Sequence, residues 1–75
     1  MKPIIECVPN FSEGRNRAVI DQITQTIADT EGVSLLNVDP GVATNRTVVT
    51  FTGDPDSVIE AAFRGIKKAA ELSPL

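Results

Sequence analysis

The chain has 75 residues, 41% hydrophobic and 23% charged, with a formal net charge of −3. This composition suits one small globular domain. The acidic balance and the three aromatic residues argue against nucleic-acid binding, which favours a basic surface with stacking rings. One cysteine and no histidine exclude an internal disulfide and a zinc site of the usual ligand set, and we expect no metal.

No apolar run approaches the roughly 20 residues that span a bilayer, and the N-terminus lacks the apolar core of a signal peptide. A lone free cysteine is typical of reducing compartments, so we expect a cytoplasmic protein without membrane contact. A domain this small buries only about 60% of its unfolded surface. We therefore expect a partner subunit or further polypeptide to stabilise it.

The first predicted element is a strand over about residues 4–8, which are rich in β-branched side chains. Pro9 is expected to stop this strand, because proline cannot donate a hydrogen bond to a sheet. Turn-forming residues follow, and a helix is predicted over about residues 16–30, with Gly32 as its stop. Its apolar side chains recur at helical spacing: Val19, Ile20, Ile23 and Ile27.

Residues 33–38 read as a second strand, and Asp39-Pro40-Gly41 predicts a turn directly after it. A third strand is expected over residues 46–52. Alternation places Thr47, Val49 and Phe51 on one face of this strand and Val48, Thr50 and Thr52 on the other.

The second helix has the clearest start signal, with Asp54 as N-cap and Pro55 at the first helical position. We expect two i,i+4 ion pairs, Glu60 with Arg64 and Lys67 with Glu71. A wide apolar stripe is predicted to face the core, formed by Val58, Ile59, Ala62, Phe63, Ile66, Ala69 and Ala70.

The predicted order is strand, helix, strand, strand, helix. This order indicates an α+β fold, namely a ferredoxin-like split βαβ sandwich (β-α-β-β-α) whose final strand is missing. Residues 1–75 would then form one partial domain. In that topology the missing strand pairs with the first, so residues 4–8 would form an exposed apolar edge that invites another chain.

Two polar loops are the candidate sites, residues 9–16 and 39–47. Asp39 could orient a catalytic base or bind a cationic substrate group, although a turn role is the commoner one. Arg46 could hold a substrate carboxylate, or it could be a solvated charge at the start of a strand. If the first and third strands ran parallel, the two loops would lie at opposite ends of the sheet.

The remaining candidates have strong structural alternatives. Asn10, Ser12 and Asn45 could bind a ligand, but such side chains in loops mostly bond local backbone. Glu13 is more typical of a helix entry than of a general base. Cys7, within a strand, is more typical of a small buried side chain than of a nucleophile.

The segments ECVPNFSEG (residues 6–14) and DPGVATNRTVVTFTG (residues 39–53) closely resemble the opening of the formiminotransferase family, and the likeness extends from about Ile5 to Ala70. The resemblance implies an N-terminal subdomain of a glutamate formimidoyltransferase. Such an enzyme transfers the formimino group from N-formimino-L-glutamate to the co-substrate tetrahydrofolate during histidine degradation. Its two α/β subdomains bind the substrates between them, and it is commonly dimeric.

The resemblance also implies site roles. Asp39 becomes an expected active-site carboxylate that supports the catalytic histidine, and Asn10, Ser12, Asn45 and Arg46 become expected cleft residues. The family's histidine lies in a basic, glycine-containing segment that has no counterpart here, and residues 71–75 depart from the family pattern. We therefore expect the chain to be inactive alone and to associate with itself or with the remainder of the enzyme.

Two alternatives stay open at this point. The chain could be a stand-alone, non-catalytic ferredoxin-like module that binds a partner through the edge at residues 4–8. It could also be an unrelated ferredoxin-like regulatory domain that binds a small metabolite.

Overall fold

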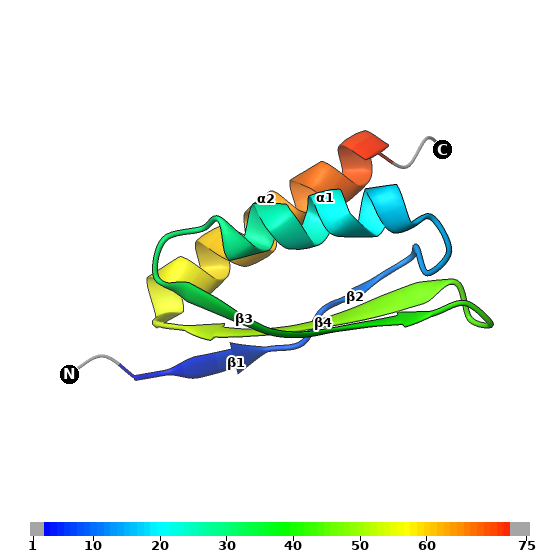
Figure 1. The fold of residues 1–75 in the computed structure, drawn as a ribbon. Coiled ribbons are helices and arrows are strands. Elements are labelled where there is room, and N and C mark those ends of the chain that lie inside the picture. Colours follow the sequence, from blue (N-terminus) through cyan, green and yellow to red (C-terminus); the bar gives the residue numbers. More distant parts are fainter. Residues whose placement is uncertain (1–2, 73–75) are drawn as a thin grey trace.

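The computed structural model describes residues 3–72 (Figure 1). Both helices cover one face of an antiparallel sheet, and within these residues the other face is uncovered (Figure 1). The α+β, ferredoxin-like arrangement expected from the element order is confirmed. The elements are β1 (Ile5–Cys7), β2 (Asn10–Phe11), α1 (Arg17–Ala28), β3 (Val33–Gly41), β4 (Arg46–Gly53) and α2 (Pro55–Leu72).

The sheet is organised around β4. β3 pairs with β4 along its whole length, while β1 pairs with residues 51–53 and β2 with residues 47–48. Since a strand has only two edges, β1 and β2 must lie end to end on the edge of β4 that β3 leaves open. β4 is therefore the central strand of the described sheet.

β1 ends at Cys7, before Pro9, as predicted, but the chain resumes pairing with β4 directly after the proline, in β2. Cys7 lies opposite Phe51 and Asn10 lies opposite Val48, so β2 continues the register of β1 without a shift. The carbonyl oxygen of Pro9 accepts a 3.0 Å hydrogen bond from the N–H of Val49. Proline removes one donor from the ladder but keeps its acceptor, and on an edge strand this loss is tolerated.

The turn predicted at Asp39-Pro40-Gly41 is also displaced. These residues continue β3, with Asp39 opposite Val48 and Gly41 opposite Arg46, after a register shift between Leu35 and Asn37. The chain reverses over residues 42–45, where the N–H of Asn45 donates to the carbonyl oxygen of Val42 (3.3 Å). A four-residue hairpin loop makes this reversal without using the fixed φ of Pro40.

Helix α1 begins after Asn16, whose Oδ1 accepts a hydrogen bond from the N–H of Val19 (3.3 Å). It ends at Ala28 and is slightly shorter than predicted. Gly32 stands in the following turn at a φ of +84°, a conformation that glycine adopts without steric cost. This turn aligns β3 for pairing with β4.

The core lies between the helices and the sheet. β4 alternates as predicted, with Val49 and Phe51 fully buried and Thr47 almost so. Ile23 and Ile27 of α1, together with Val58 and Ala61 of α2 and Phe11 of β2, complete the cluster. Gly65 lets the two helices approach, since a Cβ there would lie 3.0 Å from Cδ1 of Ile27.

Helix α2 begins as predicted, because Asp54 accepts hydrogen bonds from the N–H of Ser57 (3.1 Å) and from its hydroxyl (2.8 Å). The predicted Glu60–Arg64 ion pair is present at 2.8 Å. Lys67, however, is not the partner of Glu71, which pairs with Lys68 at 3.4 Å. Neither helix of residues 3–72 combines the length and apolarity needed to cross a membrane.

The predicted apolar stripe of α2 is only partly buried. Val58, Ala61 and Gly65 face the core, with Ala62 and Ala69 at its margin. Three large members of the stripe are instead exposed: Ile59 (68%), Phe63 (58%) and Ile66 (62%). The sheet beneath α2 ends at β1, so it covers only one side of the wide apolar arc.

Candidate functional site

The two polar loops meet at one end of the sheet. β1 and β2 run antiparallel to β4, so the carboxyl end of β2 lies beside the beginning of β4. The parallel arrangement considered from the sequence, which would have separated the loops, is wrong. Strand order alone leaves strand direction open, and the antiparallel ladder decides it in favour of a shared site.

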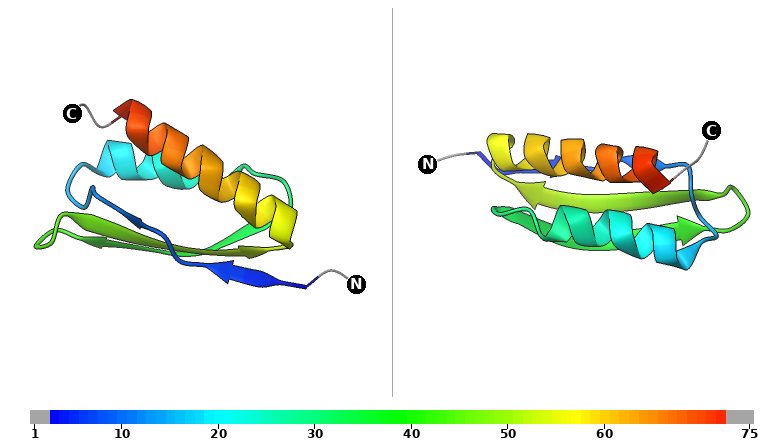
Figure 2. Two further views of the ribbon diagram at one scale, coloured as in Figure 1. Left: turned by 180° about the vertical axis from the view of Figure 1, so that it is seen from behind. Right: turned by 90° about the horizontal axis from the view of Figure 1, so that it is seen from above.

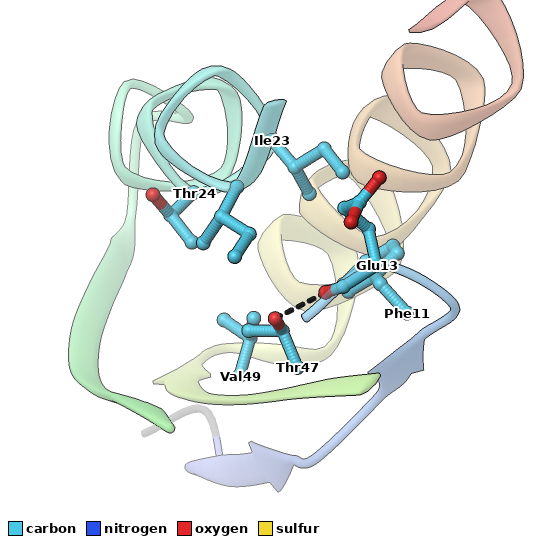
Figure 3. Close-up of a pocket in the computed structure, with 7 residues that line it drawn as sticks. Phe11, Glu13, Ile23, Thr24, Thr47 and Val49 are labelled. Atoms are coloured by element: carbon cyan, nitrogen blue, oxygen red, sulfur yellow. Dashed lines mark hydrogen bonds between the residues drawn. The ribbon is translucent and has the colours of Figure 1, made fainter. Parts of the chain in front are cut away.

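Three hydrogen bonds join the first loop to the β3–β4 hairpin. The N–H of Gly14 donates to Oδ1 of Asn45 (3.0 Å), and Nε of Arg15 donates to the carbonyl oxygen of Val42 (3.0 Å). The buried hydroxyl of Thr47 donates to the carbonyl oxygen of Glu13 (Figure 3). The loops therefore form one connected unit.

Gly14 is packed against the backbone of the hairpin. A Cβ at this position would lie 2.4 Å from the carbonyl oxygen of Gly41 and 2.5 Å from the backbone nitrogen of Arg46. No L side chain fits there without moving main-chain atoms. From the sequence, Gly14 is indistinguishable from an ordinary turn residue. Its role as a contact point has no signal in the sequence beyond its being glycine.

Asn10 and Asp39 lie on the same face of the sheet. Both are opposite Val48, Asn10 on β2 from one side and Asp39 on β3 from the other. Directly opposite residues in an antiparallel sheet place their side chains on the same face. This face is turned away from the helices, because the alternate residues Thr47 and Val49 are the buried ones. Two strand spacings, about 10 Å, separate the Asn10 and Asp39 backbones.

Arg46 belongs to the same face by alternation, two residues before Val48 on β4. Asn10, Asp39 and Arg46 are all exposed, as expected for side chains that could receive a ligand. Ser12 is exposed in the loop that follows β2. The structure thus brings the carboxylate, the guanidinium and the amide predicted from the sequence onto one surface, with Ser12 at its margin.

Asn45 has a structural role. It adopts a φ of +53° in the hairpin turn, a conformation that asparagine tolerates better than most residues. Its Oδ1 is occupied by the Gly14 N–H. Asn45 therefore shapes the site by joining its two loops.

Glu13 is the helix-entry residue that the sequence indicated. Its Oε2 accepts hydrogen bonds from the N–H groups of Asn16 (3.1 Å) and Arg15 (3.2 Å). These bonds lower the pKa of the Glu13 carboxyl below its ordinary value, and the bond from Asn16 has the larger effect. A carboxylate held this way fixes the path of the chain from the first loop into α1.

Sequence reasoning missed a set of polar side chains on the open face. Asn37 of β3 lies opposite Thr50 of β4, and Ser34 lies opposite Thr52, which also faces Glu6 of β1. Together with the Asn10–Val48–Asp39 row, they line the uncovered face with hydroxyl, amide and carboxylate groups. The alternation of β4 in the sequence places Thr50 and Thr52 on this face. Their neighbours on β1 and β3 follow only from the pairing register, which the sequence does not show.

A crevice between α1 and the sheet is not a ligand site. Its lining residues are Phe11, Glu13, Ile20, Ile23, Thr24, Thr47 and Val49 (Figure 3). Its walls are too close for a water molecule to enter. It is a packing seam, and the open sheet face remains the candidate site.

Comparison with known proteins identifies related chains. The family described as "Formiminotransferase domain, N-terminal subdomain" matches residues 4–74. A formimidoyltransferase-cyclodeaminase of Dictyostelium discoideum is 54% identical over 72 residues, which are 96% of this chain and 13% of the relative. The Rattus norvegicus protein of that name is 53% identical over 72 residues, with the same coverage.

A shorter relative is the glutamate formimidoyltransferase of Streptococcus pyogenes serotype M1. It is 48% identical over 71 residues, which are 95% of this chain and 24% of the relative. The resemblance inferred from residues 6–14 and 39–53 is confirmed. The chain thus spans about an eighth to a quarter of the length of these relatives.

Proposed function

We propose that the open face of the sheet forms one wall of a glutamate formimidoyltransferase active site. The proposal starts from the family: this chain belongs to the formiminotransferase family and corresponds to the N-terminal subdomain of its transferase domain. The observation that carries the proposal is the row formed by Asn10, Val48 and Asp39, with Arg46 on the same face. Relatives named glutamate formimidoyltransferase and formimidoyltransferase-cyclodeaminase support it.

The proposed reaction moves a formimino group from N-formimino-L-glutamate to tetrahydrofolate, which acts as a co-substrate. An amine nitrogen of the folate attacks the amidine carbon and forms a tetrahedral intermediate. Its collapse breaks the bond to the glutamate nitrogen, which leaves with a proton. The reaction needs a base to take the proton of the attacking amine and a cationic group to hold substrate carboxylates.

Asp39 supplies the carboxylate of this site. A carboxylate beside an imidazole fixes its tautomer and stabilises the imidazolium that forms when it takes a proton. The chain has no histidine, so the base comes from other polypeptide of the assembled enzyme. The chain alone is therefore expected to be inactive.

Arg46 is proposed to hold a substrate carboxylate through paired N–H donors, whose planar geometry matches that group. Asn10 and Ser12 are proposed to donate hydrogen bonds at the edge of the same surface. Asn45 contributes by joining the loops that carry these residues.

The cellular setting follows from the same proposal. The enzyme would act in histidine degradation in the cytoplasm, with formiminoglutamate and folate as its small-molecule partners. The chain would work as a partial subdomain, joined to the rest of the enzyme or to a second subunit.

A chimera tests the proposal. Residues 1–75 replace the matching segment of the Streptococcus pyogenes relative, whose 48% identity favours a compatible interface. We expect formimino transfer by the chimera, and a fall in kcat of about a hundredfold or more for Asp39→Asn, the usual effect of disabling acid–base catalysis. Asp56→Asn, at an exposed position in the first turn of α2, is the matched control.

Two results would contradict the proposal. One is an Asp39→Asn chimera as active as the Asp56→Asn control. The other is measurable formimino transfer by the isolated 75-residue chain, because that turnover would not depend on an external base.

A further inference from the structure

The open face of the sheet extends well beyond the row that contains Asp39. Figure 2 shows β1 and the β3–β4 hairpin at opposite ends of the sheet, with both helices on the face opposite to this one. At the β1 end, Thr52 of β4 lies opposite Glu6 on one side and Ser34 on the other. Thr52 points to the open face, because its neighbour Phe51 is buried against the helices. Glu6, Thr52 and Ser34 therefore form a second polar row across this face.

The second row lies far from the first. The two rows cross β4 at Val48 and at Thr52, which are about 13 Å apart at the usual rise of a strand. Because two strand spacings also separate β1 from β3, the backbones of Glu6 and Asp39 lie about 16 Å apart. Arg46 is farther from Glu6, at about 20 Å. Glu6 is thus outside the group of side chains assigned to the reaction, but one extended ligand could contact both.

The Glu6 side chain is exposed, so a ligand can reach it. Within the described part of the chain, residues 3–72, its carboxylate joins no ion pair and accepts no hydrogen bond. An ionised carboxylate has two acceptor oxygens, and a pair of parallel N–H donors binds both at once. The hydroxyl group of Thr52 lies on the neighbouring strand, directly opposite Glu6. The second row therefore suits a ligand edge that carries paired N–H donors.

The surface between the two rows is less polar. β1 and β2 keep one register on β4, which brings Val8 opposite Thr50. Val8 is 48% exposed, and both residues point to the open face by alternation. Their methyl groups form an apolar patch between Glu6 and Asp39, on which the flat face of a ring can lie. A ring placed there has one edge at Glu6 and the opposite edge toward Asp39.

We propose that this patch binds the ring system of tetrahydrofolate, with Glu6 accepting hydrogen bonds from the ring edge that carries the 2-amino group. That edge presents two adjacent N–H donors, which match the two oxygens of a carboxylate as a guanidinium does. The inference rests on the proposed function, from which it takes the co-substrate. It adds the orientation of the ring, whose reactive amine lies away from the 2-amino edge and therefore on the side of Asp39.

The other substrate does not fit this position. N-Formimino-L-glutamate also carries paired N–H donors, in its formimino group. Only a few bonds separate that group from the carboxylates of the molecule. A molecule whose carboxylate is held by Arg46 therefore cannot reach Glu6, about 20 Å away along the sheet. Distance assigns Glu6 to the longer of the two substrates.

Kinetics of the Streptococcus chimera that carries residues 1–75 test this assignment. We expect Glu6→Ala to raise the KM for tetrahydrofolate by roughly tenfold or more, the usual effect of losing hydrogen bonds to a charged group. The KM for formiminoglutamate should change little. Glu31→Ala, which removes an exposed carboxylate from the α1–β3 turn, is the matched control and should leave both constants unchanged. Circular dichroism confirms the folding of each variant.

A binding measurement tests the ring orientation without turnover. Titration calorimetry compares tetrahydrofolate with an analogue whose 2-amino group is replaced by a methyl group. The chimera should bind tetrahydrofolate roughly tenfold or more tightly than the analogue, because the analogue leaves an acceptor without its donor. In the Glu6→Ala chimera the two affinities should lie within about threefold of each other, since the discriminating carboxylate is gone. The Glu31→Ala chimera should keep the preference.

The two experiments separate this inference from the proposed function. If Asp39→Asn abolishes transfer while Glu6→Ala keeps the full preference for the 2-amino group, the ring site is wrong and the proposed function stands. If the preference depends on Glu6 while Asp39→Asn is as active as its control, the ring site stands and the proposed reaction centre is wrong. A rise in the KM for formiminoglutamate alone in Glu6→Ala would also overturn the inference, because Glu6 would then hold the formimino group.

Discussion

The N–H of Gly14 donates a 3.0 Å hydrogen bond to Oδ1 of Asn45, across 31 residues of sequence. This bond joins the loop after β2 to the β3–β4 hairpin. It helps to hold Ser12 and Arg46 at the same end of the sheet. The geometry of the candidate site thus depends on a contact between its two loops, for which Asn45 supplies the acceptor.

Asn45→Gly separates the two tasks of this residue. Glycine keeps the positive φ but removes the acceptor, leaving the buried Gly14 N–H without its partner. We expect the free energy of unfolding to fall by about 1–3 kcal/mol, the usual effect of leaving a buried donor without an acceptor.

Asn45→Ala should lower the free energy of unfolding by about 1–2 kcal/mol more, since alanine is strained at this φ. Urea unfolding measures both, and Thr44→Ala, exposed in the same turn, should change stability little. Equal stability of Asn45→Gly and wild type would contradict this account.

Gly14→Ala should be the more disruptive change. The added methyl would meet backbone atoms of Gly41 and Arg46 within 2.5 Å, and these atoms belong to the paired end of the hairpin. Overpacking of this kind costs about 1–3 kcal/mol or more. A small domain with a single core has little stability to spare.

Gly41→Ala is the control for Gly14→Ala. The nearest atom to its added methyl is the hydroxyl oxygen of Thr44 at 2.9 Å, the end of an exposed side chain that can rotate away. We expect a clearly higher urea midpoint for Gly41→Ala than for Gly14→Ala. The reverse order would show that the close contact at Gly14 can relax.

Glu13 should make stability depend on pH. Hydrogen bonds from the Asn16 and Arg15 N–H groups lower its pKa in the folded state below the ordinary value of 4.5. Since the folded pKa is below the unfolded one, the stabilisation is complete above the unfolded pKa and disappears as pH falls through the folded pKa. Relative to Glu13→Gln, the wild type should lose stability as the pH is lowered from about 6 to about 3.

Urea unfolding of both proteins across this pH range measures the effect. Glu31→Gln, at an exposed position in the α1–β3 turn, is the control for general loss of negative charge. A wild type and a Glu13→Gln variant whose stability difference stays constant with pH would contradict the prediction.

Much of the fold could be predicted because its signals are local. The Asp54-Pro55 start of α2 and the Thr47, Val49 and Phe51 alternation of β4 each depend on residues that are close in sequence. The errors share a different cause. Pro40 was predicted to interrupt a strand, yet it lies within β3, and the chain resumes pairing directly after Pro9, because β4 determines the pairing at both edges. Tertiary pairing overrides turn propensity at these positions.

The sequence allows the residues of the candidate site to be named, but it does not show that they lie on one face of the sheet. Asp39 and Arg46 were singled out because loops with charged groups suggest chemistry, whereas their common face follows from a register that is not local. The exposure of Phe63 has the same origin, since helix periodicity cannot indicate how wide the sheet beneath the helix is.

Arg46→Lys in the Streptococcus chimera should separate substrate binding from chemistry. Lysine keeps the positive charge but loses the planar pair of donors that matches a carboxylate. We expect the KM for formiminoglutamate to rise by roughly tenfold while kcat changes less. The reason is that the lost hydrogen bond stabilises the bound substrate and the transition state equally. Steady-state kinetics with varied formiminoglutamate measures both constants. Arg64→Lys, which retains an ion pair with Glu60 on the exposed side of α2, is the control. If Arg46→Lys and Arg64→Lys give the same KM, Arg46 does not hold this substrate.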